Sequence, residues 1–364
     1  MMKKDGGFSA PLRVLFAGSP DIALPALDAL AGAALAPESC PWLLTGVLTN
    51  PDRPKGRSGG PEPTAAAAAA ERHNAAFAEK GLPPVAVLKP ETLKAEAREA
   101  AAALFPDILV SFAYGRIFGP KFLSLFPLGG INIHPSLLPK YRGASPIQQT
   151  ILNRDVKTGI CVQKTDLEMD TGNILAVKEI PLTGRETTFS LSRRAGEEAA
   201  ILLVQTLNGL ARALFRGEPF PEGKAQEGEP SGCSRITRDS GIIDWNKSAE
   251  EIDAMIRAYT PWPLARTTHN GQNLFILEAA PYPDAPGVPD NISGNGGLLP
   301  VPGRLLGTNK KSGILIQTGR GILAVTRLQY QARKALPWQA FLNGVRDFIG
   351  ARLTAGTRPN SEDT

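Results

Sequence analysis

Residues 107–115, DILVSFAYG, form an apolar run typical of a buried β-strand, and after a short helical segment the run GINIHP at 130–135 predicts a second strand. Strand-like runs at 13–18 and 43–49 likewise alternate with helical patterns. Short connections between alternating strands and helices predict a mostly parallel sheet with helices on both faces, because the crossovers must pass over those faces. The first 216 residues therefore predict an α/β, Rossmann-like domain.

Other segments of this half support that interpretation. A helix is predicted over 64–81, opened by Thr64 as an N-cap and closed by a glycine. The runs GICVQKT at 159–165 and NILAVKEIPL at 173–182 are close enough to pair as a hairpin, and a long helix should follow from about 188 to 216.

The composition changes after this helix. Residues 217–235 are rich in Pro, Gly and Glu without periodicity, which predicts a linker. Several short strand-like runs follow, with one amphipathic helix at 248–259, and they predict a smaller β-barrel, OB-like domain. We expect a flexible tail at 1–11, a catalytic domain at 12–216, the linker at 217–235 and a β-rich domain at 236–364, in which 284–303 would be a mobile loop.

The composition limits the classes of protein to consider. Of 364 residues, 42% are hydrophobic and 21% charged, as in soluble globular proteins, and no apolar run approaches the roughly 20 residues of a membrane span. The three cysteines and three histidines are far apart in sequence, so neither a disulfide framework nor a metal site is expected. A cytoplasmic location is the expectation.

The charge is unevenly distributed. The chain carries +5, whereas residues 301–364 contain ten Lys or Arg and three Asp or Glu, giving 10 − 3 = +7. A basic segment on a nearly neutral body suits a polyanionic partner, nucleic acid first. Charge alone is equally compatible with a basic surface that has no partner.

Asn132 and His134 are two residues apart in the strand at 130–135, so their side chains share one face. Pro135 then ends the strand, since it has no N–H to donate. The carboxyl ends of parallel strands are where α/β folds bind ligands. The alternative is a polar strand end that faces solvent.

A second cluster, TDLEMDTGNIL at 165–175, places Asp166, Glu168 and Asp170 in a loop between two strands, with Gly172 allowing close approach of the backbone. A carboxylate beside His134 would orient the imidazole and favour its protonated form. With an amide donor, such a set suits oxyanion stabilisation and proton transfer. No nucleophile is recognisable, which favours direct transfer of an acyl-type group to an amine.

The run GINIHPSLLPKYRGASPI, together with LEMDTGNIL, resembles the signature of the formyltransferases that use 10-formyltetrahydrofolate. That resemblance implies catalytic roles for Asn132, His134 and Asp170. FAGSPDIALPALDAL, GVLTNPDRPKGR, SFAYGRI and GIIDWNKSAEEIDAMIRAYTPWP are similar to the branch of the family that formylates initiator methionyl-tRNA. The likeness extends from about residue 12 to residue 352.

The resemblance also implies binding residues. The expected folate-binding residues are Phe112, Ala113, Tyr114, Gly115, Arg116, Ile117, Ser136, Leu137, Leu138, Pro139, Thr165 and Asp166. The expected tRNA-binding residues are Arg53, Lys55 and Arg57, and the basic C-terminal domain would grip the tRNA backbone. The segment GRSGGPEPTAAAAAA departs from the family, whose members carry further lysines after the GR. A monomer that uses no metal is expected.

Three other functions stay open at this stage. Formyl transfer to a small amine, such as glycinamide ribonucleotide or an amino sugar, and hydrolysis of formyltetrahydrofolate would use the same chemistry, but neither needs a basic C-terminal domain. An inactive RNA-binding protein would bind tRNA without folate turnover. A nicotinamide dehydrogenase is disfavoured because FAGSPD lacks the GxGxxG fingerprint.

Overall fold

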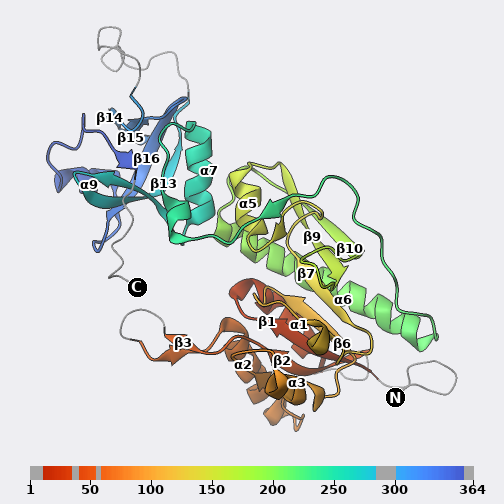
Figure 1. Ribbon diagram of the computed structural model, residues 1–364. Helices are drawn as coiled ribbons and strands as arrows, with labels where there is room; N and C mark the ends of the chain where they lie inside the picture. Colours follow the sequence, from red (N-terminus) through yellow and green to blue (C-terminus); the bar gives the residue numbers. More distant parts are fainter. Residues whose placement is uncertain (1–10, 35–40, 55–58, 284–300, 356–364) are drawn as a thin grey trace. The chain divides into compact units, whose positions relative to one another are not determined.

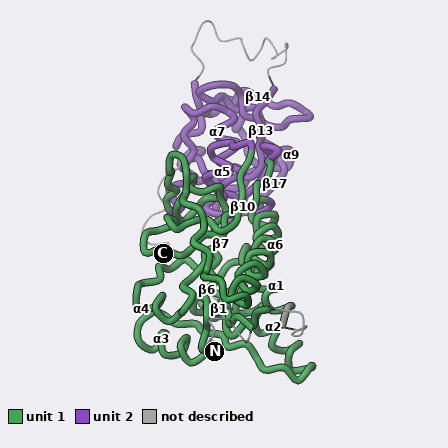
Figure 2. Tube along the Cα trace, turned by 90° about the vertical axis from the view of Figure 1, so that its right-hand side faces the viewer, with its two compact units in different colours: residues 1–146, 157–181, 191–234 green, residues 147–156, 182–190, 235–364 purple. Residues whose placement is uncertain are grey.

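The computed structural model describes residues 11–34, 41–54, 59–283 and 301–355. The chain forms two compact units, coloured separately in Figure 2. The first comprises residues 1–146, 157–181 and 191–234, and the second comprises 147–156, 182–190 and 235–364. Residues 217–234, which follow the long helix, belong to the first unit.

A seven-stranded sheet forms the centre of the first unit. The strands β1, β2, β5, β6 and β7 are parallel, whereas β9 and β10 form an antiparallel hairpin at one edge. The mostly parallel sheet and the hairpin are thus confirmed. In spatial order the strands are β10 (Ile174–Pro181), β9 (Lys157–Lys164), β7 (Gly130–His134), β6 (Ile108–Phe112), β1 (Leu12–Gly18), β2 (Trp42–Leu48) and β5 (Ala86–Leu88).

Helices lie on both sides of this sheet. In Figure 2, α3 and α4 lie on one side of β1, β6 and β7, with α1, α2 and α6 on the other. Leu15 and Ala17, two residues apart in β1, pack with Phe122 in one apolar cluster, as the two-residue period of a strand requires. The helices are α1 (Leu24–Ala34), α2 (Ala65–Glu79), α3 (Ala95–Ala102), α4 (Pro120–Leu123) and α6 (Thr188–Phe215).

The ends of the helices follow local signals. Thr64 caps α2, because its hydroxyl accepts a hydrogen bond from the Ala67 N–H at 3.1 Å. The helix α6 has 28 residues and contains an 18-residue window with a mean hydropathy of 1.2, sufficient in length and composition for a membrane span. Its buried residues, however, recur every three or four positions, at Leu191, Ala195, Ala199 and Leu203, a stripe typical of a core helix.

The second unit is built on an antiparallel sheet that packs against α7 (Ala249–Tyr259) (Figure 1). Ser248 and Glu251 form the capping box at the start of α7. The prediction of a β-rich C-terminal domain with one preceding amphipathic helix is confirmed. In spatial order the strands are β14 (Leu305–Asn309), β15 (Gly313–Gln317), β16 (Ile322–Tyr330), β13 (Gln272–Pro281), β12 (Ala265–His269) and β18 (Thr354–Ala355), with β17 (Leu336–Pro337) pairing with β16.

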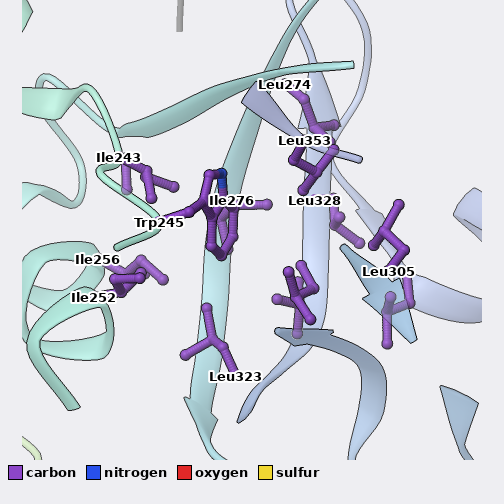
Figure 3. Close-up of a cluster of buried hydrophobic side chains, with 14 of the residues drawn as sticks. Ile243, Trp245, Ile252, Ile256, Leu274, Ile276, Leu305, Leu323, Leu328 and Leu353 are labelled. Carbon is purple, nitrogen blue, oxygen red and sulfur yellow. The ribbon is translucent and has the colours of Figure 1, made fainter. Parts of the chain in front are cut away.

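One apolar core holds this unit together (Figure 3). Ile252 and Ile256 of α7 face Ile276, Leu323 and neighbouring side chains of the sheet. The core also contains Trp245, whose Nε1 donates to the Thr267 hydroxyl at 3.0 Å. The unit also includes α5 (Pro146–Leu152) apart from its first residue, and α9 (Trp338–Asn343). Most of the loop expected at 284–303 lies outside the described residues, as does nearly all of the expected tail.

Candidate active site

The parallel sheet has a topological switch point beside β1, because β2 pairs with one of its edges and β6 with the other. Ligands of open α/β sheets bind at the carboxyl ends of the strands beside such a point. A cavity of about 470 Å³ lies there, a size suited to a small-molecule ligand. Its lining comes from the ends of β6 and β7 and from the loop after β9, all within the first unit.

Asn132 and His134 line this cavity together from β7, as their spacing predicts. The Asn132 Oδ1 accepts a hydrogen bond from the Ser111 hydroxyl at 2.7 Å, which fixes the amide so that Nδ2 is its donor end. His134 is buried, and its Nε2 is 2.9 Å from the Tyr141 carbonyl oxygen. Because a carbonyl can only accept, Nε2 carries a hydrogen, and Nδ1 is the atom left to face Asp170.

Asp170 completes the cluster from the loop between β9 and β10. Its Oδ2 accepts from the Gly143 backbone N–H at 2.8 Å and lies 3.5 Å from His134 Nδ1. Its Oδ1 accepts from Gln163 Nε2 at 3.0 Å and from Asn132 Nδ2 at 3.3 Å. The residue has a φ of +57°, a left-handed conformation that surrounding contacts must hold in place.

The expected protonation of His134 needs correction for the free protein. Burial lowers the pKa of His134 below its ordinary value of 6.5, and this effect outweighs the neighbouring Asp170 carboxylate, which raises it. The imidazole is therefore neutral at pH 7 in the unliganded protein, with Nδ1 as an acceptor. Nδ1 can take up a proton during a reaction, and Asp170 would then stabilise the imidazolium.

Gly172 permits the close backbone approach that was expected in this loop. A Cβ atom at Gly172 would lie 1.8 Å from the Lys164 carbonyl oxygen, far inside van der Waals contact. The next residue, Asn173, accepts a hydrogen bond from the Lys164 N–H through its carbonyl oxygen at 2.9 Å. Glycine is therefore required where the loop carrying Asp170 returns to the sheet.

Sequence reasoning missed Gln163 and Ser111, which hold the carboxylate and the amide of the cluster. Gln163 is 2% exposed and lies directly opposite Asn132 in the β7–β9 pairing. A polar residue at the end of the apolar strand GICVQ was an available signal for Gln163. Its contact with Asp170 depends on the register of β9, which the sequence alone does not give.

The residues expected to bind folate fall into two groups. Seven line the cavity: Ala113, Tyr114, Gly115, Arg116, Ile117, Thr165 and Asp166. The other five, Phe112, Ser136, Leu137, Leu138 and Pro139, are not part of its lining. Phe112 is fully buried within β6, and the hydroxyl of the equally buried Ser136 donates to the Lys140 carbonyl.

Two buried thiols lie close to the cluster without supplying a nucleophile. Burial raises the pKa of Cys161 to about 11 and also raises the pKa of Cys233. Both side chains are therefore protonated thiols at neutral pH. Within the described part of the chain, no group of three or more His, Cys, Asp or Glu side chains is arranged to hold a metal ion.

The residues expected to contact tRNA are only partly described. Arg53 lies in β3 (Arg53–Pro54), which pairs with β4 (Pro61–Glu62), and its guanidinium is 2.8 Å from Glu91 in an exposed ion pair. Such exposed pairs contribute little to stability, so Arg53 can leave Glu91 for another anionic partner at a small cost in free energy. Lys55 and Arg57 lie outside the described residues.

Comparison with known proteins identifies the family. The Formyl transferase model matches residues 28–207, and the model of the Formyl transferase C-terminal domain matches residues 235–346. A methionyl-tRNA formyltransferase of Treponema denticola is 43% identical over 340 residues, covering 93% of this chain and 98% of that protein. The chain belongs to the formyl transferase family. The corresponding protein of Treponema pallidum is 39% identical over 343 residues, covering 94% of this chain and 99% of that relative.

Solved structures share the fold at lower identity. HypX from Aquifex aeolicus, in complex with tetrahydrofolic acid, superposes with a TM-score of 0.56 at 14% identity, covering 96% of this chain and 51% of that one. An N-formyltransferase from Helicobacter canadensis, bound to folinic acid and dTDP-3-aminofucose, gives a TM-score of 0.55 at 19% identity, covering 86% and 98%. At these identities the likeness concerns the fold alone.

Proposed function

We propose that this formyl transferase moves the formyl group of 10-formyltetrahydrofolate to the free amino group of initiator methionyl-tRNA. The observation that carries this proposal is the 43% identity, spanning nearly the whole of both chains, to a methionyl-tRNA formyltransferase. Relatives of that name match both units of this chain rather than the catalytic half alone.

The cavity suits a folate, whose flat heteroaromatic ring carries a reactive arm. Ile117, Leu167 and Met169 line it with exposed apolar side chains, while Asn132 and His134 supply polar atoms. A pteridine ring could pack against the apolar side chains with its formyl group directed at the polar ones. We assign folate binding to the cavity-lining residues.

Catalysis needs a donor for the developing oxyanion and a base for the attacking amine. The amine nitrogen attacks the formyl carbon, a C–N bond forms, and the carbonyl electrons move to the formyl oxygen. Asn132 Nδ2 has two hydrogens, of which one bonds Asp170 and the other can donate to that oxygen. Asn132 is therefore the proposed oxyanion donor.

His134 then carries the proton between the two nitrogens. Its Nδ1 takes a proton from the attacking nitrogen, and the imidazolium is stabilised by the Asp170 carboxylate 3.5 Å away. The proton passes to N10 of the folate as the bond between N10 and the formyl carbon breaks, which releases tetrahydrofolate and formylmethionyl-tRNA. No covalent enzyme adduct and no metal enter this sequence.

The second unit offers a surface for the tRNA backbone. Between residues 301 and 355, every described Lys and Arg side chain is exposed: Arg304, Lys310, Lys311, Arg320, Arg327, Arg333, Lys334, Arg346 and Arg352. Exposed cations that release counterions from phosphates are the usual source of nucleic-acid affinity. We propose that this domain, which the sequence delimits at 236–364, holds the tRNA, with Arg53, Lys55 and Arg57 meeting its acceptor end.

The cellular setting follows from the substrate. A protein that modifies initiator tRNA works where translation begins, so we assign it to the cytoplasm. We propose that the protein acts as a monomer.

The decisive experiment supplies the purified protein with 10-formyltetrahydrofolate and one acceptor at a time. Initiator methionyl-tRNA should yield methionine with a blocked amine, whereas glycinamide ribonucleotide and an amino sugar nucleotide should not react. Loss of the formyl group without any acceptor would indicate a hydrolase. A faster reaction with either small amine than with the tRNA would contradict the proposal.

A further inference from the structure

The segment that follows α6 is attached to the candidate active site by one side chain in particular. Gln226 is half-buried, whereas the other residues from 221 to 230 are exposed. The aperiodic sequence AQEGEP around it suggests a simple connection. A single shielded glutamine in an otherwise solvated stretch indicates an anchoring contact.

Gln226 contacts the backbone on both sides of Thr171, next to Asp170. Its Nε2 lies 2.8 Å from the Asp170 carbonyl oxygen and 2.9 Å from the Gly172 carbonyl oxygen. These two acceptors flank the turn in which Asp170 has its left-handed φ. The same nitrogen is 3.3 Å from Oε1 of Gln163, whose own Nε2 donates to the Asp170 carboxylate. Gln226 thus touches both the backbone of Asp170 and a side chain that holds its carboxylate.

Arg142 fixes which way the Gln226 amide points. Its Nε and Nη2 donate to Gln226 Oε1 at 3.1 Å and 2.7 Å, so the carbonyl end is occupied and the NH₂ end must face the Asp170 loop. Arg142 belongs to β8 (Arg142–Gly143), which pairs with β11 (Gly232–Cys233) of the same segment. The Gln226 side chain is therefore held in place by Arg142, which belongs to a paired strand.

The backbone of β8 also contacts the catalytic side chains directly. The Gly143 N–H donates to Asp170 Oδ2, and the adjacent Tyr141 carbonyl accepts from His134. On the other side, the Tyr141 N–H donates to the Ser231 hydroxyl at 3.0 Å. Residues 224–233 therefore hold the 141–143 backbone and the 170–172 turn in one arrangement.

We propose that Gln226 is a positioning residue for the transfer reaction, acting through the 170–172 turn to keep the Asp170 carboxylate beside Asn132 and His134. This inference rests on the proposed function for its kinetic test. Gln226 does not line the cavity, so its effect is on the rate of the chemical step rather than on folate binding. Small displacements of a catalytic group lower rates steeply, because the reacting atoms leave their productive geometry.

The test compares three variants of the full-length protein. Gln226→Ala removes every contact of the side-chain amide. Gln226→Glu keeps an oxygen that accepts from Arg142, but it puts a second oxygen in place of the NH₂ group that donates to the Asp170 and Gly172 carbonyls. Gln205→Ala, which removes an exposed glutamine of α6, is the matched control. Both Gln226 variants should lower kcat roughly 10- to 100-fold with KM for formylfolate changed by less than about twofold, whereas the control should match wild type.

A second measurement separates positioning from a general loss of structure. His134 is one of three histidines, so its ring can be followed by NMR as the pH is changed. Asp170 raises the pKa of His134, so displacing the carboxylate should move the His134 titration to lower pH in Gln226→Ala, which adds no charge of its own. The unfolding midpoint of each variant is measured in parallel.

The outcomes are distinct. A lowered kcat together with a shifted His134 titration supports positioning. A wild-type kcat, or a lowered kcat with an unshifted titration, overturns it. If the wild-type protein formylates no acceptor, the proposed function fails, while the His134 titration still tests whether Gln226 holds Asp170.

Discussion

The two units of this protein use charge and polarity in opposite ways. In the first, the polar groups of Asn132, His134 and Asp170 are largely shielded and each has an assigned partner atom. In the second, the basic side chains of the last described 55 residues are all exposed around an apolar core. A polar group held by fixed hydrogen bonds contributes to catalysis through its position. Exposed charges contribute to binding through how many of them are present. Substitutions should therefore have large, salt-independent effects in the first unit and small, salt-dependent effects in the second.

The largest effect is expected at Asn132. Replacing it with Ala removes the proposed oxyanion donor, and the loss of one such donor typically lowers kcat by roughly 10²–10³-fold. Single-turnover formylation of methionyl-tRNA at saturating substrate measures the effect. Asn208→Ala, in α6 and outside the cavity lining, is the control and should leave the rate unchanged. A rate for Asn132→Ala close to that of wild type, in a folded protein, would refute the assignment.

A glycine pair tests how far the geometry of the first unit is fixed. In Gly172→Ala the new Cβ would meet the Lys164 carbonyl, so we expect a loss of about 1–3 kcal/mol in the free energy of unfolding and a displaced Asp170. A Cβ at Gly209 of α6 would meet nothing within 4 Å, so Gly209→Ala should stabilise the protein by about 0.5–1 kcal/mol. Denaturant unfolding measures both values. Equal stabilities for the two variants would mean that the loop accommodates a side chain.

The parts of this site that the sequence predicts are those set by local spacing. Asn132 and His134 share a strand face because side chains two apart always do, and Gly172 could be assigned to a close approach because only glycine lacks a Cβ. The partners of Asp170 could not be predicted in this way. Gln163, Gly143 and Gln226 reach it from separate segments, through the register of β9 and the pairing of β8 with β11.

The protonation of His134 shows a second limit of the sequence. A nearby carboxylate suggests a charged imidazole, and Asp170 does raise the pKa as expected. The degree of burial cannot be read from a sequence, and here burial lowers the His134 pKa by more than Asp170 raises it. The fold class was easier to predict, because alternation of strands with helices and the later run of short strands are properties of whole segments.

The pH dependence of transfer should reflect this burial. Because the pKa of His134 lies below 6.5, Nδ1 stays free to accept a proton at pH 7 and is blocked only as the pH falls through that lowered value. The rate should therefore decrease on the acid side, where the attacking amine also becomes protonated. In Asp170→Asn the loss of the carboxylate lowers the His134 pKa further, so its NMR titration should move to lower pH. A His134 titration above 6.5 in wild type would contradict the neutral assignment.

The smallest effect is expected for single basic residues of the second unit. Lys334→Ala should leave kcat at saturating tRNA unchanged, weaken tRNA binding modestly, and reduce the slope of log Kd against log salt by about 1, because one phosphate contact is lost. Lys121→Ala, an exposed lysine of α4 in the first unit, is the matched control and should keep the wild-type slope. Binding titrations at several salt concentrations measure both slopes. If the Lys121 variant changes the slope while the Lys334 variant does not, the tRNA backbone is held by the first unit. The contrast between a unit that acts by geometry and a unit that acts by charge would then not hold.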